Sequence, residues 1–257
     1  MQSKIYEWIE YKPHEALKKY IDIYWVASTN SLFLPSPKKI FPDGSNELFA
    51  NTGNNTLYFN ETIAIKPGII YLAGTMREAI NFSGIPNSNF FGIRFKPGGF
   101  STFFKFPIYE VTGQFIDLPL KELKFIFNCE DPLRTRAELD TFFLKRLGTA
   151  NDRFLSIAQD LHITSGAVTI DILSKKHEIG FRSLERLFKS NVGISPKELA
   201  KIVRFQAVLK RLKNKSYNET FLDLACELGY HDHAHLTNEI KKLTGLTPSQ
   251  LRSYFQD

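Results

Sequence analysis

The chain contains Leu184-Glu-Arg-Leu-Phe188, followed by Gly193-Ile-Ser-Pro196, and this pattern occurs a second time. The second copy has Leu236-x-x-x-Ile240 followed by Gly245-Leu-Thr-Pro248, and it lies 52 residues further along the chain. A shorter apolar pair precedes each copy, Ile170-x-x-Leu173 in the first and Phe221-x-x-Leu224 in the second. Two copies are too few for a solenoid, so the pattern predicts two similar structural units.

Each copy is predicted to fold as a helix, a short turn and a second helix. The second helix has an apolar stripe at helical spacing, which consists of Leu184, Leu187 and Phe188 in the first copy and of Leu236, Ile240 and Leu243 in the second. Gly193 and Gly245 stand where a helix ends in a left-handed residue. Ser195-Pro196 and Thr247-Pro248 then supply the N-cap and the first residue of the next helix.

The opposite face of each second helix carries the candidate binding residues. They are Arg182, Glu185, Arg186 and Lys189 in the first copy and Ala234, Thr237, Asn238 and Lys241 in the second. Guanidinium and amide groups can read base edges in the major groove of DNA, and ammonium groups can neutralise phosphates. The pattern therefore predicts two helix-turn-helix units. An ordinary helical bundle with a solvated charged face is the alternative, and the repetition of caps and stripes favours DNA binding over it.

The last hundred residues resemble the AraC/XylS transcriptional regulators. The motifs that carry the resemblance are Leu184-Glu-Arg-Leu-Phe188 with Gly193-x-Ser-Pro196, Leu224-Ala225, Gly229-Tyr230-x-Asp232-x-x-His235-Leu236, and Gly245-Leu-Thr-Pro248-x-x-x-Arg252. The chain departs from the family pattern at four positions: Ser174 and Glu178 replace the usual alanine and turn glycine of the first copy, Ala234 replaces a serine and Ile240 a phenylalanine. The resemblance implies a bacterial, cytoplasmic, sequence-specific DNA-binding regulator without enzymatic activity.

The predicted DNA-binding residues are Arg182, Ser183, Glu185, Arg186, Lys189, Arg204, Ala234, His235, Thr237, Asn238 and Lys241. Arg182 and Arg186 are expected to read guanine edges, and Glu185 to help select cytosine. Lys189, Lys241 and Arg204 are expected to hold phosphates. The resemblance makes His235 a groove-side or capping residue. The second helix offers smaller polar groups, so it is expected to contribute less to specificity than the first.

Composition and charge are consistent with this interpretation. Hydrophobic residues make up 43% of the chain and charged residues 23%, as in a globular protein, and no long apolar run predicts a signal sequence or a membrane span. The net charge is +6, but residues 175–215 alone contain 12 Lys or Arg and three Asp or Glu. This concentration indicates a polyanion as partner, although a solvated helix surface is the alternative. Two cysteines provide no disulfide framework, which fits the cytoplasm.

The first 125 residues have a different pattern. Short apolar runs are separated by glycine, proline and asparagine at spacings of roughly ten residues, which predicts a β-sandwich or barrel. Residues 15–25 have apolar residues at helical spacing and are predicted to form a helix. Tyr24-Trp25, Phe41-Pro-Asp-Gly44-x-x-Glu47-Leu48 and Phe91-Gly-Ile-Arg-Phe-x-Pro-Gly-Gly99 resemble the cupin-like sensor domain of one branch of the family. That resemblance implies a ligand-binding or interaction role for this domain.

A pocket is the candidate feature of the cupin-like domain. Asp43, Glu47, Arg77 and Arg94 are the polar residues expected near it, with structural roles as the alternative. The aromatic residues that could line it are Tyr24, Trp25, Tyr58, Phe59, Tyr71, Phe82 and Phe90, unless they are simply core. A metal-dependent cupin needs several imidazoles, and His14 is the only histidine before position 162. No metal, cofactor or catalytic residue is therefore predicted.

The predicted fold class is α+β with two domains. Residues 1–128 are expected to form the cupin-like β domain, residues 129–150 a helical linker and dimer contact, and residues 151–257 the double helix-turn-helix domain. Further helices are predicted at residues 131–147 and 152–162, and one at residues 196–213 that spans about 25 Å between the two units. Double-stranded DNA is the predicted partner. A small-molecule effector, RNA polymerase and a second copy of the chain are further candidates, and no membrane is expected.

The sequence supports three other interpretations less well than DNA binding. His231, His233 and His235 could suggest a metal site, but His233 would face away from the other two and a fourth ligand is not evident. Cys129 or Cys226 could suggest a catalytic nucleophile, but both lack an adjacent histidine. Cys226 is also expected on the buried face of its helix, as is usual for a free cysteine. The rival function is a small-molecule-binding or enzymatic β-barrel protein whose helical domain mediates protein contacts. It would require a titratable constellation in the first 125 residues, which the sequence does not provide.

Overall fold

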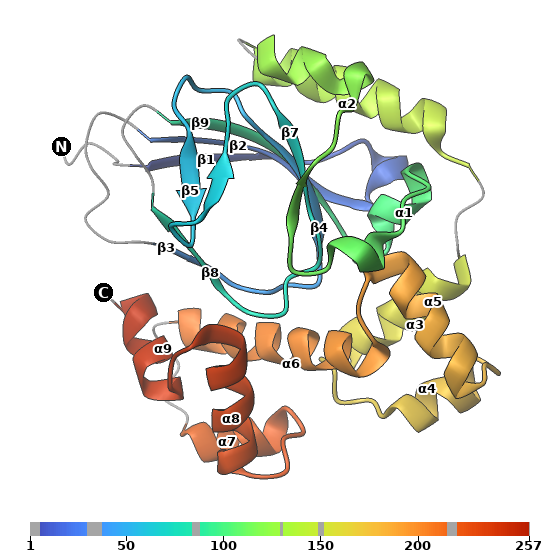
Figure 1. The fold of residues 1–257 in the computed structure, drawn as a ribbon. Helices are drawn as coiled ribbons and strands as arrows, with labels where there is room; N and C mark the ends of the chain where they lie inside the picture. The colour runs from blue at the N-terminus through green and yellow to red at the C-terminus, as the bar shows by residue number, and fades with distance from the viewer. Residues whose placement is uncertain are drawn as a thin grey trace.

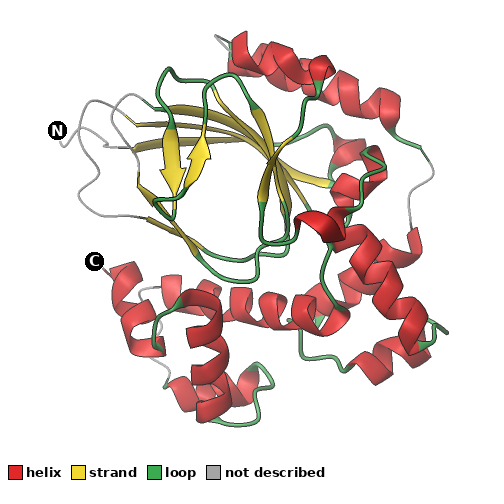
Figure 2. Cartoon of the chain, in the orientation of Figure 1, coloured by secondary structure: helices red, strands yellow, loops and turns green. Residues whose placement is uncertain are grey.

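The computed structural model describes residues 6–29, 38–83, 88–128, 131–148, 152–214 and 220–256. An N-terminal β domain lies above a C-terminal helical region, and the two are in contact along a broad front (Figures 1 and 2). The predicted α+β architecture with two helix-turn-helix units is confirmed. Cys129 lies outside the described residues.

The β domain consists of two antiparallel sheets packed face to face. The larger sheet has the strand order β1 (Tyr6–Tyr11), β2 (Ile21–Thr29), β9 (Asn89–Phe95), β4 (Asn46–Asn51), β7 (Ile70–Ala73) and β10 (Phe115–Asp117). The smaller sheet has the order β3 (Lys38–Ile40), β8 (Ile80–Ser83), β5 (Leu57–Phe59) and β6 (Ile63–Ile65). Each glycine-bounded or proline-bounded run that predicted a strand therefore contributes one to the sandwich.

Alternation along the strands separates two cores. In β2, Ile23 and Trp25 belong to the aromatic core between the sheets, whereas Tyr24 faces the other side of the larger sheet. That outer side is covered by α2 (Pro132–Arg146), whose Leu139 and Phe143 are fully buried (Figure 1). The predicted helix at residues 131–147 is thus confirmed, with Asp131 as its N-cap.

The helix predicted at residues 15–25 is wrong. Only the short 3-10 helix η1 (Glu15–Leu17) forms there, and the chain then enters β2. β2 pairs with β1 on one side and β9 on the other, and both of its faces are buried. The run Ile23-Tyr-Trp-Val-Ala27 is apolar on both faces of the strand, so it lacks a period of two and is compatible with a helix as well.

The C-terminal region consists of seven helices in the part of the chain that the structure describes. They are α3 (Asp152–Ile163), α4 (Ile170–Lys176), α5 (Phe181–Val192), α6 (Pro196–Lys213), α7 (Phe221–Glu227), α8 (His233–Thr244) and α9 (Pro248–Gln256). α4 and α5 form the first helix-turn-helix unit, α7 and α8 form the second, and α6 joins them (Figure 1). The helices predicted at residues 152–162 and 196–213 are confirmed.

The predicted caps are present. Gly193 and Gly245 follow α5 and α8 with φ of 87° and 73°, in the left-handed region that glycine adopts without a steric cost. Ser195 starts α6 with a capping box, in which its hydroxyl accepts from the backbone N–H of Glu198 and the Glu198 carboxylate accepts from the N–H of Ser195. Thr247 caps α9 by accepting from the N–H of Gln250.

The turn of the first unit accommodates its two unusual residues. Glu178 takes a left-handed conformation, with φ of 49°, where the family has glycine. The Ser174 hydroxyl donates to the carbonyl of Ile179 over 2.6 Å, and Arg153 donates to the carbonyls of His177 and Glu178. These three hydrogen bonds stabilise a backbone conformation that a non-glycine residue adopts at a cost.

Two further observations concern exposure. Cys226 is exposed, contrary to the expectation that it faces inward, because α7 buries Leu224 and Ala225 instead. Within the described ranges, none of the helices has both the length and the apolar character that crossing a membrane requires.

Candidate functional site

The outer face of α5 presents a polar surface. Arg182, Ser183, Arg186 and Lys189 are exposed and Glu185 is half-buried, whereas Leu184 and Phe188 on the opposite face are fully buried. The Phe188 ring packs against Phe154 of α3, with ring centroids 5.1 Å apart, and this contact holds α5 on α3. The five predicted residues of this helix thus lie together on one face.

The outer face of α8 is less polar. Ala234, Asn238 and Lys241 are exposed there, as predicted. Thr237 differs, since its hydroxyl oxygen is buried and has no hydrogen-bond partner among the described residues. The prediction that the Thr237 side chain faces outward is therefore wrong for its polar atom.

His235 has a capping position at the start of α8. Its Nδ1 accepts from the backbone N–H of His231 over 3.2 Å, and its Nε2 lies 3.1 Å from Oε1 of Glu239. Asp232 caps the same turn by accepting from the N–H of His235 over 2.7 Å. Of the two roles that the family resemblance implied for His235, this arrangement corresponds to the capping one.

Arg204 of α6 makes its contacts inside the helical domain. Its guanidinium donates to the carbonyl of Gly166 over 2.9 Å and lies 5.1 Å from the ring centroid of Tyr230. It therefore joins the α3–α4 turn to the second helix-turn-helix unit. The guanidinium thus has partners inside the domain, and the phosphate contact of Arg204 stays a prediction.

Two aromatic residues near α5 were not predicted. Tyr109, in the 3-10 helix η2 (Ile108–Val111) of the β domain, borders the same shallow hollow as Arg182, Glu185 and Arg186. Phe181, the first residue of α5, lies at this hollow too, and both aromatic side chains are 54% exposed. Tyr109 carried no sequence signal, because it is more than 70 residues from α5 and belongs to the other domain.

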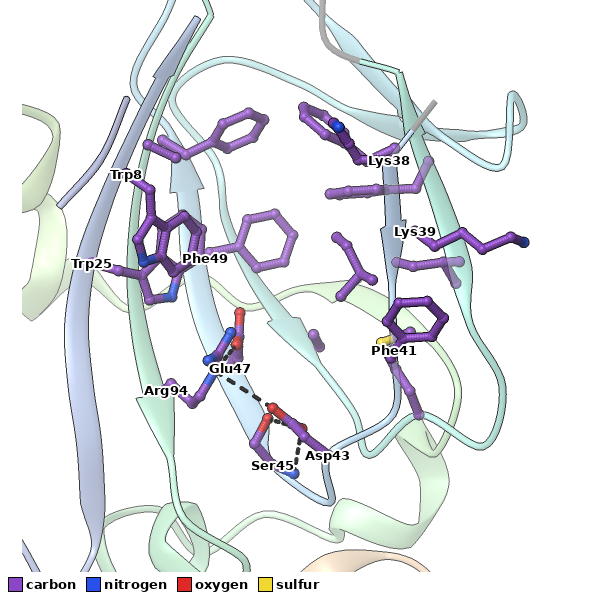
Figure 3. A pocket seen from close by; sticks show the side chains of 18 of the residues that line it. Trp8, Trp25, Lys38, Lys39, Phe41, Asp43, Ser45, Glu47, Phe49 and Arg94 are labelled. Carbon is purple, nitrogen blue, oxygen red and sulfur yellow. Dashed lines mark hydrogen bonds and ion pairs between the residues drawn. The ribbon is translucent and has the colours of Figure 1, made fainter. Parts of the chain in front are cut away.

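A cavity of about 600 Å³ lies between the two sheets of the β domain (Figure 3). The stacked indoles of Trp8 and Trp25, with centroids 4.7 Å apart, form one wall, and the strand that carries Lys38 and Lys39 forms the opposite one. Its remaining aromatic lining consists of Phe41, Phe49, Phe59, Phe82, Phe90 and Phe115. Four of the seven predicted aromatic residues therefore line it, whereas Tyr24, Tyr58 and Tyr71 do not.

One end of the cavity is polar (Figure 3). Nε of Arg94 lies 2.5 Å from Oε1 of Glu47 and 3.6 Å from Oδ2 of Asp43. Asp43 also accepts from the N–H and hydroxyl of Ser45, which holds the turn before β4. Burial raises the pKa of Glu47, although the nearby Arg94 guanidinium opposes that shift. Three of the four predicted polar residues thus meet at the cavity, and Arg77 does not.

The helical domain completes the cavity wall. Gln206, Leu209 and Lys213 of α6 line it, and Nε2 of Gln206 donates to the carbonyl of Pro42 over 2.5 Å. Phe41 is also in contact with Phe205 of α6, with centroids 6.0 Å apart. The connecting helix between the two helix-turn-helix units is therefore part of this site.

Metal ligands do not gather in the described part of the chain. No three His, Cys, Asp or Glu side chains there are close enough together to hold an ion. His231 pairs with Asp232 and His235 with Glu239, so two of the three histidines of the suspected cluster have hydrogen-bonding roles at the start of α8.

Comparison with known proteins identifies two domain families. Residues 173–254 match a helix-turn-helix domain family, and residues 9–117 match a domain of unknown function, DUF6597. No curated protein matches the chain. Similar solved structures include the C-terminal domain of AraT, a response regulator from Geobacillus stearothermophilus, at 20% identity and a TM-score of 0.37 over 40% of this chain and 84% of that one. An apo variant of ToxT from Vibrio cholerae has 10% identity and a TM-score of 0.48 over 98% of both chains, and fatty-acid-bound ToxT has 10% and 0.46 over 96% and 94%.

The helix-turn-helix match covers both repeated units and the helix between them. α5 and α8 each present a polar face on a buried apolar stripe, and each is held on a shorter helix by a turn. α6 joins the two units, with one unit at each of its ends. The chain is a DNA-binding transcription regulator with a double helix-turn-helix domain at residues 173–254, and its β domain contains a cavity of ligand size.

Proposed function

We propose that α5 and α8 enter successive major grooves on one face of an operator, with α6 as the spacer between them. α6 has 18 residues and so a length of roughly 27 Å, while successive major grooves on one face recur about every 34 Å. Bending of the DNA would close the remaining difference. The observation that carries the proposal is the pairing of two capped helices with outward polar faces on one rigid connecting helix.

The proposed roles follow the chemistry of each side chain. Arg182 and Arg186 read guanine edges, because a guanidinium can donate two hydrogen bonds to O6 and N7. Glu185 accepts from cytosine, and Lys189 and Lys241 bind phosphates. On α8, Ala234 and Asn238 offer one apolar and one amide contact, so α5 supplies more of the specificity.

The cavity of the β domain is the proposed effector site. Its aromatic walls suit an apolar or aromatic body, and Asp43, Glu47 and Arg94 suit a polar end that both donates and accepts hydrogen bonds. The proposed domains are residues 1–128 for sensing, 129–150 for a linker and dimer contact, and 151–257 for DNA. RNA polymerase is the proposed partner in activation, the cytoplasm the compartment, and no catalytic step is included.

The full chain bound to random duplexes at two salt concentrations, followed by sequencing of the retained DNA, tests the proposal. Enrichment of two half-motifs about one turn apart, with binding that weakens steeply as salt rises, is the expected result. Retention without enrichment would leave a basic domain of general polyanion affinity and would contradict sequence-specific recognition.

A further inference from the structure

Residues 75–79, the connection between β7 and β8, touch all three helices that determine how the two helix-turn-helix units are arranged. Thr75 contacts the end of α5, Arg77 the start of α6 and Ala79 the end of α8. We propose that this connection positions α5 and α8, the two proposed reading helices, relative to each other. It would thereby set the spacing between operator half-sites. The inference rests on the proposed two-groove mode of binding.

The contact of Thr75 is the most buried of the three. The Thr75 side chain is completely buried, and its hydroxyl donates to the carbonyl of Val192 over 2.5 Å. The same oxygen accepts from Nδ2 of Asn46, which is also fully buried, over 3.0 Å. Movement of α5 away from the β domain would leave buried polar atoms without partners, so this end of α5 is firmly held.

Arg77 holds the next helix at its first turn. Its Nε lies 2.8 Å from Oε1 of Glu198, the residue whose other carboxylate oxygen completes the capping box of Ser195. Both partners are partly exposed, so the pair is individually weak. The location of this ion pair matters more than its energy, because it links residues 75–79 to α6, the helix that joins the two units.

Ala79 reaches the second unit through its backbone. Its N–H donates to the carbonyl of Leu243 over 2.7 Å, at the C-terminal end of α8. The last carbonyls of a helix have no partner within the helix, so an external donor can fix the position of that end. The connection therefore supplies a donor to the final turn of α8 as it does to α5.

Neighbouring residues of the β domain make further hydrogen bonds to the end of α5. The hydroxyls of Ser101 and Thr112 donate to the carbonyls of Asn191 over 3.0 Å and of Gly193 over 2.8 Å. The N–H of Gly113 donates to the carbonyl of Thr75 over 3.0 Å, which joins this second contact to the connection itself. Three consecutive carbonyls at the end of α5 are thus capped by side chains of the other domain.

A fixed distance and angle between the two helices has a direct consequence for DNA. Each base pair inserted between the half-sites moves one of them by about 3.4 Å and turns it by about 35°. A rigid pair of reading helices discriminates strongly against such insertions, whereas a pair joined only by α6 adapts to them more easily. Loss of the connection's contacts should therefore relax spacing preference without altering the recognition of one half-site.

The test uses the full chain and the operator selected above. Dissociation constants are measured for the native spacing, for spacings longer or shorter by one base pair, and for a single half-site. Thr75→Val combined with Arg77→Gln is expected to reduce the discrimination between native and altered spacing about fivefold, as the loss of one net hydrogen bond would. Binding to the single half-site is expected to stay unchanged, which separates positioning from base reading.

Two sets of variants make the result specific. Thr75→Ser keeps the hydroxyl and should restore the wild-type preference, and Arg77→Gln alone changes a partly exposed side chain, so it tests the inference even if the double variant does not fold. Thr62→Val, in the same domain, removes an exposed hydroxyl that donates to the nearby carbonyl of Asn60, and should change nothing. Unchanged discrimination in folded Thr75→Val/Arg77→Gln protein, or an equal loss in Thr62→Val, would overturn the inference. A wild-type chain that reads a half-site but shows no spacing preference would overturn it too, while absence of any half-site would instead contradict the proposed function.

Discussion

Nζ of Lys201 in α6 lies 2.8 Å from Oε1 of Glu239 in α8, so a carboxylate that is only 8% exposed joins the connecting helix to the second helix-turn-helix unit. His235 contributes to the same cluster, since its Nε2 lies 3.1 Å from that oxygen. The second unit is therefore held on α6 by a largely buried charge as well as by apolar packing. Removal of one partner of such a pair is costly, because the other charge then stays buried without a compensating charge.

Glu239→Ala should destabilise the helical domain by about 1–3 kcal/mol, because Lys201 and His235 lose their shared partner. Urea unfolding followed by circular dichroism measures the change. Glu138→Ala is the matched control, since Glu138 pairs with Arg134 on the exposed side of α2 and should matter little. Equal effects of the two substitutions would contradict a special role for the buried carboxylate.

Gly193 and Gly245 offer a matched comparison. Gly193 ends α5 and Gly245 ends α8, both with positive φ. A methyl group at Gly193 would lie 2.5 Å from Oγ1 of Thr112, whereas one at Gly245 would meet nothing within 4 Å. Gly245→Ala should cost about 1 kcal/mol through backbone strain alone, and Gly193→Ala distinctly more. Thermal unfolding of both variants measures which substitution is more destabilising. An equal or larger effect of Gly245→Ala would contradict close contact between the β domain and the end of α5.

Arg186→Ala should lower affinity for the selected operator by about 1–3 kcal/mol and relax specificity at one base pair. Lys189→Ala should instead weaken binding to all sequences alike. It should also reduce the slope of log affinity against log salt concentration by about 1, the value for one lost phosphate contact. Competition binding with specific and random duplexes distinguishes the two. Lys145→Ala, an exposed lysine of α2, is the control for a simple loss of positive charge. Equal losses on both kinds of DNA for Arg186→Ala would refute base reading.

Asp160 gives the first unit a pH dependence. The hydrogen bond from Lys176, and that from His177, hold the pKa of Asp160 below its usual value. Its contribution to stability is therefore complete above the unfolded value of about 3.9 and disappears as the pH falls through the lower folded value.

Asp160→Asn should accordingly lower the free energy of unfolding at pH 7, by no more than about 1 kcal/mol because the cluster is partly solvated. The difference from wild type should shrink below pH of about 4. Denaturant midpoints at neutral and acidic pH measure it, with Asp171→Asn as an exposed control on α4. A difference that persists undiminished at low pH would mean that the carboxylate charge is not the cause.

Local chemistry explains what the sequence could predict. The caps at Gly193 and Ser195 and the bounds of α6 depend on residues within one turn, so they could be read directly. The polar end of the cavity was also within reach, since Asp43 and Glu47 flank one tight turn and Arg94 lies on the strand that pairs beside β4.

Contacts between distant segments could not be read in the same way. Arg204 is a basic residue on a helix, and only the proximity of Gly166 and Tyr230 shows that it points inward. The approach of Tyr109 to α5 and of residues 75–79 to three helices depends on how the two domains meet. Patterns of period and capping describe single elements, so they carry no information about that meeting.

The stacked pair of Trp8 and Trp25 has a practical consequence. They are the only tryptophans of the chain, and both line the cavity of the β domain. The intrinsic fluorescence of the protein, excited at the red edge where tyrosine does not absorb, therefore originates entirely from that cavity. A compound that enters it would change the emission directly, so a screen for effectors can use the unlabelled protein.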